Sequence, residues 1–169
     1  SALAPCQLLS NRNHGVTGHP PQEVPLSHQA RVEAVAAQVI ATRSSGTPAV
    51  FAKKSVSHLV PDPHRRQQGP VIDLSDLDHV LEVDVEGRTA TAESGVTFRA
   101  LVEATLPHGL VPKVVPELEG ITLGGAVSGC SVESMSYKYG GFHDSALEYE
   151  LVTGQGEILT LTPDDPLFH

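Results

Sequence analysis

The sequence contains few of the residues on which several kinds of binding site depend. It has no tryptophan and only 4% aromatic residues, so aromatic platforms for stacking bases or sugars are not expected. Its two cysteines, Cys6 and Cys130, are too few for a disulfide scaffold or a cysteine-rich zinc site. Basic residues are also scarce, since 11 Lys and Arg stand against 20 Asp and Glu and give a net charge of −9. This balance argues against nucleic acid and anionic membranes as partners, because both require a basic protein face.

Signals for membranes and metals are missing as well. No apolar run approaches the length that spans a bilayer, and no signal-peptide pattern opens the sequence. We therefore expect no membrane span and, by default, a cytoplasmic location. The nine histidines are scattered without the spacing of a metal site, so no metal is expected.

The 169 residues are rich in turn formers, with 15 Gly and 13 Pro. Residues 1–29 have the composition of a partly disordered leader. Apolar spacing predicts helices over 27–43 and 97–106, capped by Ser27 and Thr97. Predicted strands cover 49–52, 71–74, 80–85, 88–93, 147–152 and 158–161, the first of them buried. Helices mixed with hairpins indicate an α+β fold.

The densest run of small residues lies between the last two hairpins, at 120–141. Thr122 can cap a short helix there, and Gly124, Gly125 and Gly129 remove side chains from one side of it. Such a helix start could bring backbone N–H groups close to a diphosphate. Close helix packing through small residues explains the same spacing equally well, and both interpretations stay open.

Three other features have a chemical and a structural interpretation. Residues 53–58 could supply donors to the same diphosphate or form a solvated loop, and 133–141 could line a polar cofactor or form an ordinary loop. His143 and Asp144 could act as an acid/base pair, although a structural histidine is the more common case. Cys130 could be a nucleophile, although small buried cysteines are usually inert.

Taken in order, several segments resemble one family. They read K-K-S-V-S-H, V-I-D-L-S-D-L, E-S-G-V-T-F-R-A-L, P-E-L-E-G-I-T-L-G-G-A-V-S-G, V-E-S-M-S-Y-K-Y-G and Y-E-L-V-T-G-Q-G-E-I. This order is similar to the PCMH-type FAD-binding domain of the vanillyl-alcohol-oxidase flavoproteins. Within it, the fourth and fifth segments most resemble the delta-24-sterol reductase (Diminuto) branch and its bacterial FAD-linked oxidase relatives. The resemblance covers about residues 30–169.

The resemblance implies a two-lobed α+β domain that holds FAD between its lobes. A small α/β lobe would cover about 30–77. A lobe with a mixed or antiparallel sheet and helices would cover about 78–169. In the family a C-terminal substrate domain follows, and this chain is expected to lack it.

The resemblance also assigns FAD contacts to three segments. They comprise Lys53, Lys54, Ser55, Val56, Ser57 and His58; Pro116, Glu117, Thr122, Leu123, Gly124, Gly125 and Gly129; and Ser134, Tyr139 and Gly140, with Leu151 and Val152 near the adenine. Most members use a glycine-rich loop for the first segment, and this chain has no glycine in it. Some members attach flavin through a histidine placed like His58. The sterol reductase branch does not, so non-covalent FAD is expected.

The implied activity is that of an FAD-dependent oxidoreductase. A hydride would pass between flavin and an organic substrate, either a sterol-like alkene or a small alcohol. No catalytic residue is assigned within this chain. The implied partners are the small-molecule substrate, the missing substrate domain and, as an open option, a second copy in a homodimer. The alternatives are a standalone FAD- or nucleotide-binding or interaction module without turnover, and an α+β domain whose glycines only pack helices.

Overall fold

The computed structural model describes residues 26–54 and 69–168. Its elements follow in the order α1 (His28–Arg43), β1 (Val50–Ala52), β2 (Val71–Asp73), β3 (Val80–Asp84), β4 (Thr89–Ala92), α2 (Phe98–Thr105), the 3-10 turn η1 (Leu106–His108), α3 (Leu123–Ser128), α4 (Ser136–Tyr139), the 3-10 turn η2 (Phe142–Ser145), β5 (Tyr149–Val152) and β6 (Ile158–Leu161). The predicted α+β class is confirmed. Of the predicted site residues, Ser55, Val56, Ser57 and His58 lie outside the described residues.

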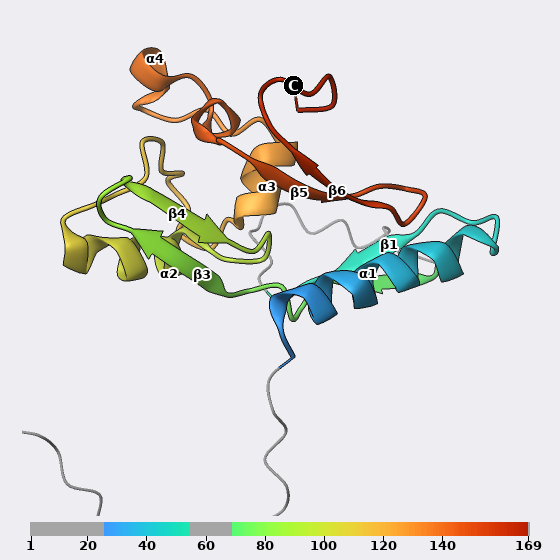
Figure 1. Ribbon diagram of the computed structural model, residues 1–169. Coiled ribbons are helices and arrows are strands. Elements are labelled where there is room, and N and C mark those ends of the chain that lie inside the picture. Colours follow the sequence, from blue (N-terminus) through green and yellow to red (C-terminus); the bar gives the residue numbers. More distant parts are fainter. Residues whose placement is uncertain (1–25, 55–68, 169) are drawn as a thin grey trace, which may run out of the picture.

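The strands form three two-stranded sheets. β1 and β2 are parallel, with Phe51 beside Ile72, whereas β3–β4 and β5–β6 are antiparallel hairpins. Figure 1 shows α1 lying along the β1–β2 sheet at one end of the molecule and α2 beneath the β3–β4 hairpin at the other. The short helix α3 lies between these two ends and contacts η2, the turn that precedes β5.

The first hydrophobic core fixes α1 against β2 and β5. Ser27 begins the helix, as predicted, by accepting a hydrogen bond from the Ala30 N–H. Val32 and Val35 then pack on Ile72 and Leu77, and Val152 from β5 packs against the same cluster. The hairpin of β5 and β6 is therefore packed on the end of the molecule that contains α1.

A second group of apolar side chains surrounds the start of α2. Thr97 caps this helix, as predicted, and places Phe98 in a position only 1% exposed. The Phe98 ring meets Phe142 edge to face, with 4.8 Å between ring centroids. The chain leaves the end of α2 through η1 and Gly109, which has a φ of +72°. A glycine suits this left-handed position because it has no Cβ.

Several local predictions need correction. β1 is not a buried strand, because Phe51 is 64% exposed while its neighbour Ile72 is covered by α1. Leu106, the last residue of the helix predicted over 97–106, lies beyond the end of α2 and is exposed. The stretch 133–141 contains the short helix α4, and Cys130 is exposed rather than buried.

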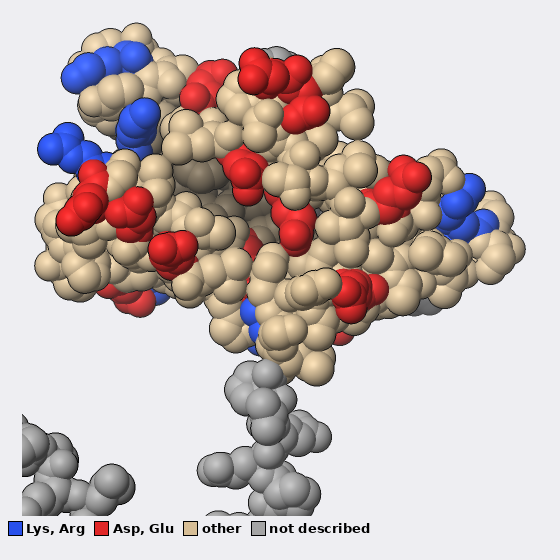
Figure 2. Space-filling model, in the orientation of Figure 1, with Lys and Arg blue, Asp and Glu red and all other residues tan. Residues whose placement is uncertain are grey.

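The surface carries mainly acidic groups. In Figure 2, Asp and Glu are spread across the visible face, and Lys and Arg gather toward its two ends. Among the described residues, none of the helices combines the length and apolarity that a bilayer crossing requires. Within the same residues, no group of three or more His, Cys, Asp or Glu is placed to hold a metal ion.

Candidate functional site

The structure brings the first two predicted FAD segments together. Lys53 follows directly after β1, and its Nζ lies 3.5 Å from the Thr122 hydroxyl at the start of α3. These residues are 69 positions apart in the sequence. Thr122 is only 3% exposed and is held in place by a bridge to Thr97 at the start of α2. A cation from one end of the molecule therefore meets the central helix.

The hydroxyl of Thr122 also accepts a hydrogen bond from the Gly125 N–H at 3.4 Å. It acts as the acceptor in both contacts, so its own hydrogen can be donated to a further acceptor. A Cβ added to Gly125 would lie 3.1 Å from this hydroxyl and 4.0 Å from Lys53 Nζ. Gly125 is exposed and leaves open surface directly beside the Lys53 ammonium group.

The neighbouring Gly124 is needed for close packing rather than for open surface. A Cβ there would lie 2.9 Å from the Ser94 Cβ and 3.1 Å from the Ser94 carbonyl oxygen, so something would have to shift. Gly124 therefore permits close contact between α3 and the segment 94–96. Packing therefore explains Gly124, whereas Gly125 leaves open space beside a cation. That a diphosphate lies in this space stays a prediction.

The contacts of α3 change the chemistry expected at its start. The Leu123 N–H donates to the Val96 carbonyl at 2.9 Å, and the Gly124 N–H donates to the Ser94 carbonyl at 2.8 Å. With the Gly125 N–H bound to Thr122, the first-turn donors already have partners within the chain. A helix of six residues also adds little dipole. An anion here would meet the side chains of Lys53 and Thr122 rather than free backbone N–H groups.

The second predicted lysine is neutralised within the protein. Lys54 Nζ lies 2.8 Å from Asp78 Oδ2 and 3.9 Å from Asp76 Oδ1. The hydrogen bond to Asp78 is the main reason that the pKa of Lys54 is raised. Among the residues that the structure describes, no carboxylate forms an ion pair with Lys53. Lys53, rather than Lys54, is therefore the cation that can receive an anionic ligand.

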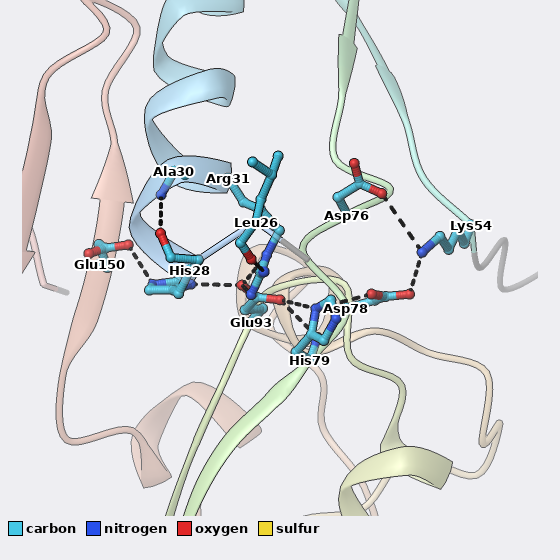
Figure 3. A network of polar contacts seen from close by, with 11 residues as sticks. Leu26, His28, Ala30, Arg31, Lys54, Asp76, Asp78, His79, Glu93 and Glu150 are labelled. Carbon is cyan, nitrogen blue, oxygen red and sulfur yellow. Dashed lines mark hydrogen bonds and ion pairs between the residues drawn. The ribbon is translucent and has the colours of Figure 1, made fainter. Parts of the chain in front are cut away.

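A buried carboxylate lies behind this site. The side chain of Glu93, at the end of β4, is fully buried and accepts hydrogen bonds from Arg31 and His28 on α1 and from His79 beside β3 (Figure 3). Arg31 donates to Glu93 Oε1 from Nε at 3.0 Å and from Nη2 at 2.6 Å. The backbone N–H of His79 donates to Glu93 Oε2 at 2.8 Å, and the His79 ring lies 2.9 Å from the same oxygen.

Burial alone would raise the pKa of Glu93, but the hydrogen bonds from His28, Arg31 and His79 outweigh it. The pKa falls from its ordinary 4.5 to about 2. The ionised carboxylate ties α1 to the β3–β4 hairpin. His28 extends the tie to β5, because its Nε2 lies 3.0 Å from Glu150 Oε1.

This anchored carboxylate positions α3 through the segment 94–96, which follows Glu93 in the chain. The Gly95 N–H donates to the Leu77 carbonyl at 2.7 Å, and the carbonyls of Ser94 and Val96 receive the first N–H groups of α3. A Cβ on Gly95 would come within 2.4 Å of the Leu77 carbonyl oxygen, so this close approach requires glycine. The place of Thr122 and Gly125 thus depends on Glu93.

The rest of the second segment surrounds this position. Pro116 is buried and Glu117 is exposed, whereas Gly129 ends α3 and lies at the surface. Leu123 is half-buried. A Cβ on Gly129 would approach the Gly125 carbonyl oxygen to 2.9 Å, so this glycine also serves the local backbone.

The third segment lies apart from Lys53. α4 lies at the opposite end of the molecule from β1 in Figure 1. Ser134 is exposed and Tyr139 half-buried, and Gly140 adopts a φ of +77° that leaves room for the Asp144 carboxylate. Val152 belongs to the core under α1, and Leu151 is 38% exposed. The FAD roles of these residues stay predictions.

The His143–Asp144 pair is not a hydrogen-bonded acid/base pair. His143 Nε2 lies 3.7 Å from Asp144 Oδ1, which is too long for a hydrogen bond. Asp144 instead accepts from the Gly141 N–H at 2.7 Å and closes the turn after α4. Asp144 therefore supports the backbone rather than the imidazole.

Sequence patterns alone missed the polar network behind the site. Glu93 and Arg31 are 62 positions apart, and Glu93 and His28 are 65 apart. The local signals were present: an isolated Arg on the apolar face of a helix, and a Glu ending a strand before Ser-Gly. Pairing them required the fold.

The chain is similar to proteins of known family. A family model described as an FAD binding domain matches residues 29–162, which is most of the chain. The chain belongs to this FAD-binding domain family. It is 38% identical over 102 residues to a delta(24)-sterol reductase homologue of Caenorhabditis elegans, covering 60% of this chain and 19% of that protein.

Two further relatives broaden the comparison. Human delta(24)-sterol reductase is 30% identical over 146 residues, covering 83% of this chain and 28% of the relative. Decaprenylphosphoryl-beta-D-ribose oxidase of Mycolicibacterium smegmatis is 35% identical over 99 residues, covering 58% and 21%. The matched segments thus span only 19% to 28% of the length of these curated relatives.

A solved structure shares the fold. 6-Hydroxy-D-nicotine oxidase from Arthrobacter nicotinovorans superposes with a TM-score of 0.66 at 22% identity, covering 81% of this chain and 30% of that one. This neighbour confirms the predicted PCMH-type FAD-binding fold. The division into lobes at about residue 77 stays a prediction.

The residues at the site fit an anionic cofactor. Lys53 supplies a positive charge without a carboxylate partner in the described chain, and Thr122 supplies a hydroxyl that can donate. Gly125 leaves open surface where any larger residue would project toward Lys53. A family that binds FAD requires such groups for the diphosphate.

Acid should weaken the fold through Glu93. A carboxyl whose pKa is lowered on folding contributes stability above its unfolded pKa, here 4.5, and loses it as the pH falls toward about 2. We expect the free energy of unfolding to drop by roughly 2–4 kcal/mol over this range. Glu93→Gln should flatten the dependence, because the titrating group is gone. Urea unfolding followed by circular dichroism measures this in a chain without tryptophan.

Glu148→Gln is the matched control, because Glu148 is exposed. It should keep the pH dependence of the unmodified protein. An unchanged slope in Glu93→Gln would show that Glu93 is not an ionised anchor. At neutral pH the same Gln variant should cost about 3–5 kcal/mol, since it leaves buried Arg31 without its partner.

Proposed function

We propose that this chain is the FAD-binding portion of an oxidoreductase in which a hydride passes between an organic substrate and flavin. The observation that supports it best is the approach of Lys53 Nζ to Thr122 beside the open surface of Gly125. Two segments expected to bind the same diphosphate meet at this point. Bound FAD would supply the redox chemistry, and the protein would bind and orient it.

In this proposal the diphosphate lies against Lys53, Thr122 and Gly125. The Lys53 ammonium donates a charge-assisted hydrogen bond to a phosphate oxygen, and the Thr122 hydroxyl donates a second one. Glu93 and the segment 94–96 hold these groups in place. Because the chain has a net charge of −9, a lysine without a carboxylate partner marks this part of the surface as a place where an anion can bind.

The proposed substrate class follows the relatives. Their names describe reduction at a sterol and oxidation of a lipid-linked ribose. We propose a sterol-like alkene or a small alcohol as the substrate of the protein to which this chain belongs. Turnover of such a compound by that protein would separate an oxidoreductase from a binding module without activity.

We also propose that the FAD is bound non-covalently.

Two single substitutions should weaken or abolish FAD binding. Lys53→Met deletes the charge, and we expect affinity about 10- to 100-fold weaker, because hydrogen bonds to charged groups contribute about 1.5–3 kcal/mol. Gly125→Glu adds bulk and negative charge beside Lys53 and should abolish binding. Quenching of flavin fluorescence on titration with the protein measures both dissociation constants.

Gly154→Glu is the matched control for the second variant, because a Cβ at Gly154 has no atom within 4 Å. It adds the same charge in the turn between β5 and β6 and should bind FAD normally. Normal binding by both Lys53→Met and Gly125→Glu would place the diphosphate elsewhere.

The form of attachment can be tested on the coloured protein. After precipitation with acid, the flavin absorbance should move entirely to the supernatant. Colour retained in the pellet would contradict non-covalent binding and indicate a bond through His58. In that case His58→Ala should release the colour to the supernatant, and colour that still stayed in the pellet would place the bond at another residue.

A further inference from the structure

The two adjacent lysines after β1 are used in opposite ways. Lys53 Nζ lies 3.5 Å from Thr122 at the proposed diphosphate position, whereas Lys54 Nζ lies 2.8 Å from Asp78 on the approach to β3. Figure 3 shows Lys54 directed toward Asp76 and Asp78, with Asp78 lying between Lys54 and the group of His79 and Glu93. The two lysines follow one another directly after the last residue of β1, so a contact that fixes the Lys54 side chain also constrains the backbone that carries Lys53.

Asp78 is itself well anchored. It is only 31% exposed, and its Oδ1 lies 3.3 Å from the ring of His79. His79 is bound to Glu93 through its backbone N–H and through its ring. A continuous polar chain thus runs from Arg31 through Glu93, His79 and Asp78 to Lys54. Asp76 is less suited to this task, because it is 78% exposed and its nearer oxygen lies 3.9 Å from Lys54.

We propose that Asp78 is a positioning residue for the cofactor site: by holding Lys54, it directs Lys53 toward the diphosphate and keeps Lys54 away from it. The inference rests on the proposed function. It assigns a task to a residue that no motif singled out. It also explains why two adjacent lysines provide only one cation to the site. The ion pairs of Asp78 in the described chain are with Lys54 and His79, so in this proposal it acts on Lys53 through the backbone at Lys54.

Charge reversal separates positioning from simple attraction. Asp78→Lys makes the charge near the site more positive by two, and attraction alone would make FAD bind more tightly. Positioning predicts the opposite, because the introduced ammonium group would repel Lys54 and release the end of β1. We expect FAD affinity about three- to ten-fold weaker in Asp78→Lys and in Lys54→Asp, measured by flavin fluorescence quenching. The combined variant Lys54→Asp/Asp78→Lys restores the pair and should return to within about two-fold of the unmodified protein.

Asp76→Lys is the control that makes a similar charge change at a weaker contact, and its affinity should fall by less than that of Asp78→Lys. Tighter binding by Asp78→Lys would overturn the inference. So would a combined variant that binds no better than Lys54→Asp, because Lys54 would then contact the cofactor itself. Failure of the unmodified protein and all variants to bind FAD would instead contradict the proposed function. Melting temperatures of all variants show whether a loss of affinity is only a loss of folding.

Discussion

The burial of one ionised carboxylate, Glu93, is the constraint on which the rest of the arrangement depends. A buried charge is tolerated only where donors surround it, and here Arg31, His28 and His79 provide them from two separate elements. The helix α1 and the β3–β4 hairpin must therefore meet at this carboxylate. Its immediate successors in the chain, residues 94–96, receive the first backbone donors of α3. One carboxylate thereby fixes both the junction of the sheets and the central helix beside the proposed cofactor.

At the proposed site, only one of two adjacent lysines keeps an uncompensated positive charge. On a surface with an excess of acidic residues, Lys54 is compensated by Asp78 and Lys53 is left facing Thr122 and Gly125. A single uncompensated cation beside a hydroxyl and an open glycine is suited to a phosphate oxygen. The backbone donors of α3 hold the helix to its neighbours instead. In the proposed site, the side chains of Lys53 and Thr122 therefore bind the diphosphate that the sequence pattern had assigned to backbone N–H groups at the start of a helix.

Much of this could be predicted from local sequence. Ser27 and Thr97 identified the starts of α1 and α2, and Thr122 identified the start of α3, because caps depend on residues three positions away. The ordered segments also predicted the family and its fold correctly. The links from Glu93 to Arg31 and His28 were not predictable, since they join residues more than 60 positions apart that belong to no local pattern. The exposure of Phe51 was missed for a related reason: burial of a strand depends on which face α1 covers.

A crystal structure of the protein grown with FAD tests the central claim most directly. The account predicts a diphosphate oxygen within hydrogen-bond distance of Lys53 Nζ, about 2.7–3.2 Å, lying over the open surface of Gly125. Lys54 should stay paired with Asp78 in that complex. FAD bound with its diphosphate away from Lys53 and Thr122 would contradict the account, even if the fold and the Glu93 network were unchanged.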